Sequence, residues 1–177
     1  MLQLPELYSK HLQKQFNYPQ YLILSILINL LQNLKTVQLE ELARRFPYPI
    51  QLRSRIKKLQ RFLSLAQFNI KTLWFPILIS WVKEEWRSGE AMYLVMDRSQ
   101  WRAINLLMVS IVYDQRAIPV YFTLLPKKGN SNLKQQKQVL SPALKLLKDY
   151  KITVLGDARI LRCGISQMVV IRATGLS

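Results

Sequence analysis

Two aspartates each follow a short run of mostly apolar residues, sixty positions apart. Asp97 follows residues 92–96, and Asp157 follows residues 152–156. A continuous apolar run is typical of a strand buried on both faces of a sheet, and an acid at its C-terminal end lies where open α/β sheets bind ligands. Two carboxylates that meet there repel each other and favour a shared hard cation such as Mg²⁺. Alternatively, each Asp only ends a strand or begins a turn, as Asp often does.

The segment between the aspartates has the pattern of further strands and a helix. The expected elements are strands at 92–97, about 103–113, about 117–124 and 152–155, with a helix at about 132–150, bent at Pro142. Asp114 and Gln115 form a tight turn, and Pro119 places the third strand at a sheet edge because proline cannot donate to a ladder. A meander and a crossover helix return the last strand parallel to the first, so Asp97 and Asp157 reach the same end of the sheet. This β-β-β-α-β order is the topological start of the ribonuclease-H-like fold.

Residues 1–88 have the periodicity of a helical region, which ends at a break after Ser88 where we expect the domain boundary. Pro19 lies near the start of an apolar helix, and Thr36 is a candidate cap for a helix that ends before Pro47. A basic helix is expected at about 51–65, and a core-packing helix at 71–88. The basic side chains of the 51–65 helix are Arg53, Arg55, Lys57, Lys58 and Arg61. A helix, a proline-containing break and a basic helix are compatible with a helix-turn-helix against DNA, and equally with a solvated basic face.

The composition indicates a folded basic protein with a polyanionic partner. Half of the residues are apolar, enough for a core, and 26 Lys and Arg against 10 Asp and Glu give a net charge of +16. Residues 1–88 and 89–177 share this excess equally. The lone Cys163 excludes an internal disulfide and a Cys/His zinc site, and His11 is expected at a helix surface. The absence of a possible internal disulfide suits a reducing cytosol, so we expect a cytoplasmic protein. The apolar run at 21–31 is too short to span a bilayer and indicates a buried helix.

Several segments of the second half resemble the DDE transposases of the fourth bacterial insertion-sequence family. They are residues 96–101, 105–110, 116–121, 125–132 and 154–157. The resemblance covers about residues 92–159, and residues 1–88 are loosely similar to the DNA-binding and dimerising region of that family. It implies an α/β protein with a helical N-terminal region and a partial ribonuclease-H-like catalytic core at 89–177, diverging from about residue 158. It also implies DNA transposition, a nucleoid-associated bacterial location, transposon ends and target DNA as partners, and a homodimer.

The resemblance assigns Asp97 and Asp157 as the first and second carboxylates of the catalytic triad. In such a site, two Mg²⁺ or Mn²⁺ ions about 3.5–4 Å apart activate a water or a DNA 3′-hydroxyl and stabilise the leaving oxygen. Arg98, Lys127 and Lys128 are expected to hold the DNA backbone near the reaction centre by charge, which salt weakens.

The chain departs from the family pattern after Asp157. The family has a third acid, a Glu on a later helix, whereas this sequence has no Asp or Glu after Asp157. We therefore expect a truncated or frameshifted copy that binds DNA and, weakly, metal but lacks strand transfer. Two alternatives remain open: a non-catalytic DNA-binding protein that uses the helix at 51–65, and a peripheral membrane protein, for which the run at 21–31 offers little support.

Overall fold

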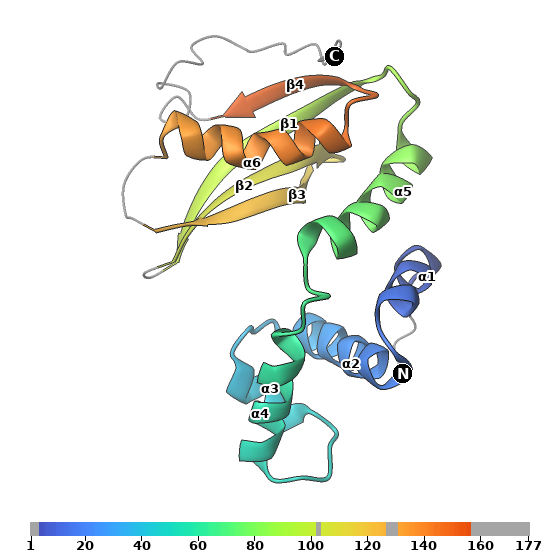
Figure 1. The fold of residues 1–177 in the computed structure, drawn as a ribbon, viewed down its shortest axis with the longest axis vertical. Helices are drawn as coiled ribbons and strands as arrows, with labels where there is room; N and C mark the ends of the chain where they lie inside the picture. Colours follow the sequence, from blue (N-terminus) through green and yellow to red (C-terminus); the bar gives the residue numbers. More distant parts are fainter. Residues whose placement is uncertain (1–3, 102–103, 127–130, 157–177) are drawn as a thin grey trace. The chain divides into compact units, whose positions relative to one another are not determined.

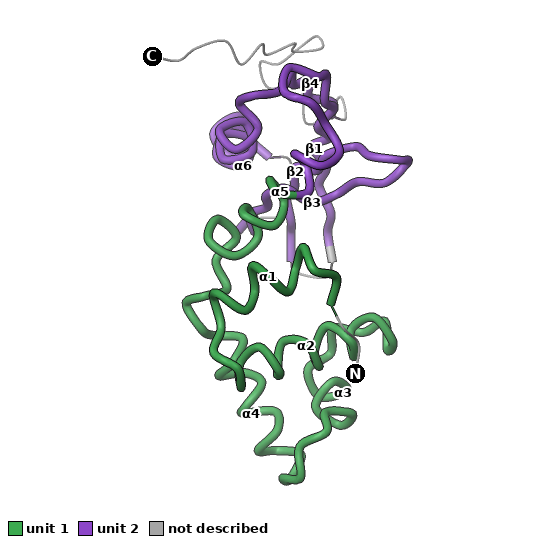
Figure 2. The backbone as a smooth tube through the Cα atoms, turned by 90° about the vertical axis from the view of Figure 1, so that its right-hand side faces the viewer, with its two compact units in different colours: residues 1–80 green, residues 81–177 purple. Residues whose placement is uncertain are grey.

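The computed structural model describes residues 4–101, 104–126 and 131–156. Within these ranges it has five α-helices and then a four-stranded mixed sheet, with a sixth α-helix between the third and fourth strands (Figure 1). This order confirms the α/β prediction with a helical N-terminal region. The chain divides into two compact units, residues 1–80 and 81–177 (Figure 2). The division falls inside α5 (Phe75–Glu85), N-terminal to the break after Ser88. The DNA-binding or dimerising role of residues 1–88 stays a prediction.

Unit 1 is helical throughout its regular structure. Its elements are α1 (Glu6–Gln15), α2 (Tyr18–Leu34), α3 (Leu39–Arg45), α4 (Leu52–Leu63) and a π-helical turn (Ile70–Trp74) that runs into α5. Asn17 and Gln20 exchange side-chain to backbone hydrogen bonds at the start of α2, and Pro19 lies in its first turn, as expected. Thr36 does not cap α3, because α3 starts after Gln38, whose N–H donates to the Thr36 hydroxyl. Among the described helices, none alone is long and apolar enough to cross a membrane.

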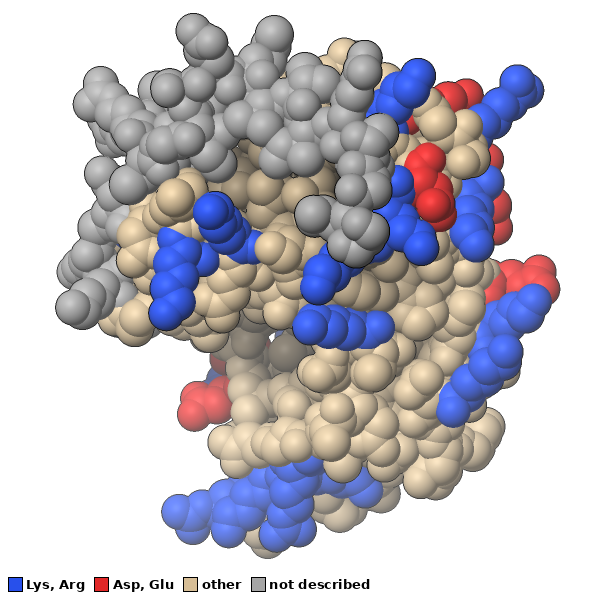
Figure 3. Space-filling model, turned by 45° about the horizontal axis from the view of Figure 1, so that its top comes forward, with Lys and Arg blue, Asp and Glu red and all other residues tan. Residues whose placement is uncertain are grey.

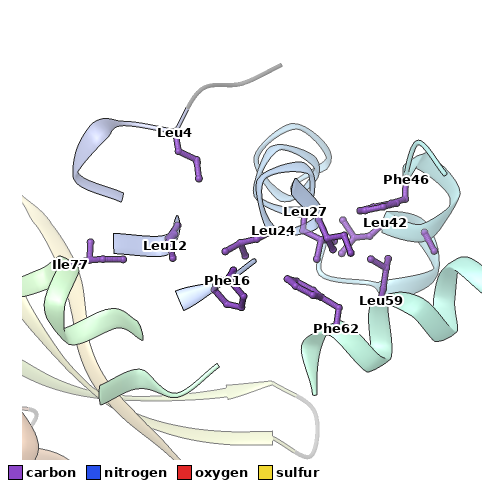
Figure 4. Packing of buried hydrophobic residues seen from close by; sticks show 12 residues of the cluster. Leu4, Leu12, Phe16, Leu24, Leu27, Leu42, Phe46, Leu59, Phe62 and Ile77 are labelled. Carbon is purple, nitrogen blue, oxygen red and sulfur yellow. The ribbon is translucent and has the colours of Figure 1, made fainter. Parts of the chain in front are cut away.

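Unit 1 has one hydrophobic core to which α1, α2, α3 and α4 all contribute (Figure 4). Phe16 of α1 lies next to Phe62 of α4, with ring centroids 6.0 Å apart, and both rings contact Phe68. His11 was expected at the surface but is half-buried, and its Nε2 lies 3.1 Å from the Ser80 hydroxyl. Buried side chains of α3 and α4 belong to this same core, which holds the two helices together.

Unit 2 contains the sheet and one covering helix. Its elements are β1 (Ala91–Trp101), β2 (Ile104–Tyr113), β3 (Arg116–Leu125), α6 (Leu133–Leu146) and β4 (Lys151–Gly156). The strand order is β3-β2-β1-β4, with β1–β2 and β2–β3 antiparallel and β4 parallel to β1. This arrangement confirms the β-β-β-α-β order, the parallel return of β4 and the edge position of β3 in the described sheet. Asp114 and Gln115, with φ of 44° and 60°, form the turn between β2 and β3.

Within the described part of unit 2, only one face of the sheet is covered, the face on which α6 lies (Figure 1). Burial alternates along β1: Met92, Leu94 and Met96 are buried, whereas Tyr93 is 51% exposed and Asp97 is exposed. The expectation that this strand is buried on both faces is therefore wrong. We call the uncovered side, which carries Asp97, the open face. Besides Tyr93, the exposed apolar side chains of the open face are Ile104, Val112, Phe122, Leu124 and Leu155.

An aromatic cluster joins the end of α5 to the end of β2. The rings of Trp81, Trp86 and Tyr113 lie 5.1–5.3 Å apart, centroid to centroid. The Tyr113 hydroxyl donates a hydrogen bond to the Glu85 carboxylate, and this bond, with a smaller contribution from burial, raises the pKa of the phenol. The helix expected at 71–88 is thus shorter, since α5 ends at Glu85 and follows a π-helical turn, and the C-terminal part of this segment packs through aromatic side chains, as expected.

Candidate functional site

The parallel pairing of β1 and β4 defines the position of Asp97. In the register, Met96 of β1 lies opposite Gly156, the last residue of β4, so the residues that precede the two aspartates are partners. Asp157 itself lies outside the described residues. Asp97 does not end its strand as expected, because β1 continues to Trp101 as the antiparallel partner of β2. It lies instead where the described pairing with β4 ends.

The Asp97 carboxylate is exposed on the open face of the sheet. Its Oδ1 accepts the backbone N–H of Arg98 at 2.7 Å. A carboxylate in this setting still has acceptor capacity, and Mg²⁺ is commonly held by one or two carboxylates together with waters and substrate phosphates. Within the described ranges, no three His, Cys, Asp or Glu side chains come together as a metal site. A metal site at Asp97 would therefore need further ligands from outside the described residues or from a substrate.

Arg98 lies on the other face of the sheet from Asp97, because successive side chains along a strand point to opposite faces. Its Nη2 donates to Oδ1 of Asn105, a side chain that is only 2% exposed, at 3.0 Å. The buried Nε of Arg98 has no hydrogen-bond partner among the described residues. The backbone N–H of Arg98 thus contacts the Asp97 carboxylate, whereas its guanidinium lies on the other face of the sheet. Lys127 and Lys128 lie outside the described ranges.

A basic hollow of about 380 Å³ lies on α4. It is lined by Ile50, Ser54, Lys57, Lys58 and Arg61. The Nζ of Lys58 is 4.0 Å from the centroid of the Tyr48 ring, which in turn stacks on Phe46. Three cations and a hydroxyl around one hollow, with no acid in its lining, suit a phosphate group. Arg53 on the same helix is also exposed.

Arg55 has a structural role that the sequence analysis missed. Its guanidinium donates to four backbone carbonyls at the end of α3 and beyond it. These are the carbonyls of Ala43, Arg44 and Phe46, at 3.1–3.2 Å, and of Ile50, at 2.9 Å. The last carbonyls of a helix have no partner within the helix, so a cation there satisfies them. The sequence offered one signal for this role: a short helix ends just before Pro47, which has no N–H to donate to the last carbonyls of that helix.

No protein-family model, curated protein or solved structure matches this chain. Any proposal of function therefore depends on the Asp97 edge of the sheet, on the basic surfaces, and on the resemblance of residues 92–159 to the DDE transposases.

The excess positive charge is not neutralised within the described part of the chain. There, the pair of Arg44 and Glu41, at 3.4 Å, is the only ion pair. On the face that Figure 3 shows, basic side chains lie in several separate groups. Such a surface attracts polyanions over a range set by the salt concentration.

Proposed function

We propose that this chain belongs to a DNA strand-cleavage and strand-transfer system of the DDE transposase type, with a divalent cation held between Asp97 and Asp157. The observation that supports this most is the parallel register in which Met96 lies opposite Gly156. Neighbouring strands lie about 4.8 Å apart, so carboxylates at the next position of each strand would be close enough to share a cation. A partial ribonuclease-H-like core is the finer fold that fits this strand order and crossover.

The proposed chemistry uses the exposure of Asp97. A bound Mg²⁺ or Mn²⁺ would activate a water or a 3′-hydroxyl and stabilise the leaving oxygen at a phosphodiester. Asp97 supports this role because its carboxylate lies on the open face, away from α6, the helix that covers the sheet within the described part of unit 2. The third carboxylate of the family pattern has no counterpart after Asp157 in this sequence. We therefore expect weak metal binding and no efficient strand transfer from these residues alone.

The basic face of α4 would hold the DNA backbone. Arg53, Lys57, Lys58 and Arg61 are the side chains proposed for it, and Arg55 supports them by fixing the end of α3. Contacts of this kind are independent of sequence and weaken with salt. The hollow on α4 also favours a second candidate function, a non-catalytic DNA-binding protein, which needs no metal.

Asp97→Asn should weaken Mn²⁺ binding about tenfold or more, because an amide has no charge with which to hold a hard cation. Electron paramagnetic resonance of free Mn²⁺ during a titration of the full chain measures the dissociation constant. Asp114→Asn is the matched control, since it removes the same charge from an exposed turn of the same unit. Equal constants for both variants would contradict the metal site. Salt-sensitive DNA binding without any Mn²⁺ binding would favour the second candidate function.

A further inference from the structure

The outer side of α6 carries a row of lysines. The helix begins at a capping box formed by Asn132 and Gln135, and its inner side is buried. The buried residues are Gln136, Val139, Leu140 and Ala143. We call Lys134, Lys137, Lys145 and Lys148 the α6 lysine row; all four are exposed, and Lys148 follows in the turn after the helix. At 3.6 residues per turn, they fall within about 80° of one another, opposite the buried side.

No acidic residue lies within the α6 lysine row, and the exposed Asp149 directly follows its last member, Lys148. The sequence has no Asp or Glu between Asp114 and Asp149, and none of the four lysines takes part in an ion pair in the described structure. A solvated helix surface normally mixes both signs, because Glu and Lys three or four residues apart stabilise the helix. Here Lys134 and Lys137, and likewise Lys145 and Lys148, are like charges at that spacing and repel each other. A bound polyanion would relieve this repulsion.

We propose that the α6 lysine row binds the phosphate backbone of duplex DNA, on the opposite side of the sheet from Asp97. Lys134 to Lys145 span about 16 Å along the helix axis, a length over which duplex DNA carries on the order of ten charges. Gln138, exposed between the lysines, adds a neutral hydrogen-bond donor, whereas the Ser141 hydroxyl already donates to the carbonyl of Lys137 at 2.7 Å. Lysine is a flexible point charge, which suits phosphates better than base edges. This inference rests on the proposed function only in taking DNA as the partner, and it does not depend on the metal site.

The composition of this surface favours DNA over an anionic membrane. The exposed residues of α6 are Lys134, Lys137, Gln138, Ser141 and Lys145, none of them a large apolar side chain. A helix that lies in a membrane interface buries an apolar face in the lipid, whereas the apolar side of α6 is already buried in unit 2.

The test replaces the four lysines of the row by Gln in the full chain. Binding to a short blunt duplex is measured by fluorescence anisotropy in EDTA over a series of salt concentrations. If the row neutralises four phosphates, the slope of log K against log salt becomes shallower by about 3–4, and affinity at about 0.1 M salt falls at least tenfold. The control replaces Lys10, Lys14, Lys71 and Lys83, exposed lysines on other elements, and should change the slope by less than about 1.

Two outcomes would overturn the proposal. Equal losses in both variants would mean that only net charge matters. Unchanged DNA binding with lost binding to phosphatidylserine vesicles would assign the row to a membrane surface. Circular dichroism checks the fold, and the paired variants K134Q/K137Q and K145Q/K148Q should each give about half of the slope change. Since EDTA removes divalent ions, a failed metal site leaves this result unaffected, and Asp97→Asn should not reduce the slope.

Discussion

Leu94→Ala is expected to lower the free energy of unfolding of unit 2 by about 3–4 kcal/mol. Leu94, the fourth residue of β1, is fully buried on the face that α6 covers. Its register partners Ile111 and Val154 are also buried and belong to β2 and β4. Truncation removes apolar contacts and leaves a cavity where three strands meet, so the cost exceeds that of the lost methyl groups alone. Urea denaturation and amide hydrogen exchange of the strands measure the loss.

The matched control for this prediction is Val95→Ala, one residue along the same strand. Val95 is partly buried and lies on the open face, opposite Ser110 and Leu155. It should cost less than about 1 kcal/mol, since little apolar surface is removed from contact there. Equal losses at both positions would contradict the one-sided burial of the sheet.

Arg55→Ala is expected to destabilise unit 1 by about 2–3 kcal/mol, because a charged donor that satisfies several carbonyls is lost at once. The affected carbonyls of Ala43 and Phe46 lie where α3 ends, next to buried core side chains. Faster amide hydrogen exchange in α3 and α4 is the expected signature. Arg55→Lys should recover only part of the loss, because an ammonium cannot reproduce the planar fork of a guanidinium.

Arg53→Ala provides the contrast two residues earlier on α4. Arg53 is exposed, so its removal should change the free energy of unfolding by less than about 0.5 kcal/mol while weakening salt-sensitive DNA binding. If Arg53→Ala destabilises unit 1 as much as Arg55→Ala does, the capping role of Arg55 is wrong.

The topology of unit 2 could be predicted because local signals agree with it. Asp114 and Gln115 turn the chain between two apolar runs, and Pro119 excludes a central position for β3. Helix α6 then forms the crossover from β3 to β4, and such a crossover makes β4 parallel to β1. In unit 1, Pro19 marked the start of α2, where the structure adds a capping box at Asn17.

Other features depend on tertiary contacts that no local pattern encodes. The apolar run in β1 fits a strand covered on one face or on both, and only the placement of α6 decides between them. Arg55 and Arg53 have the same side chain on the same helix, and their roles differ because α3 ends beside Arg55. Arg98 also has a role that its residue type does not indicate, because the alternation of side chains along β1 places it on the opposite face of the sheet from Asp97. The lysines of α6 share one exposed side of the helix because its opposite side is buried in unit 2, which the spacing of the lysines alone does not show.

The central claim is that Asp97 and Asp157 share one divalent cation, and a double-mutant cycle of Mn²⁺ affinity tests it most directly. Dissociation constants are measured for the original chain, for Asp97→Asn, for Asp157→Asn and for the variant with both changes. A shared ion predicts that each single change weakens binding about tenfold or more and that the second adds little, a coupling of at least about 1 kcal/mol. Losses that add independently, or the absence of any loss, would contradict the shared site.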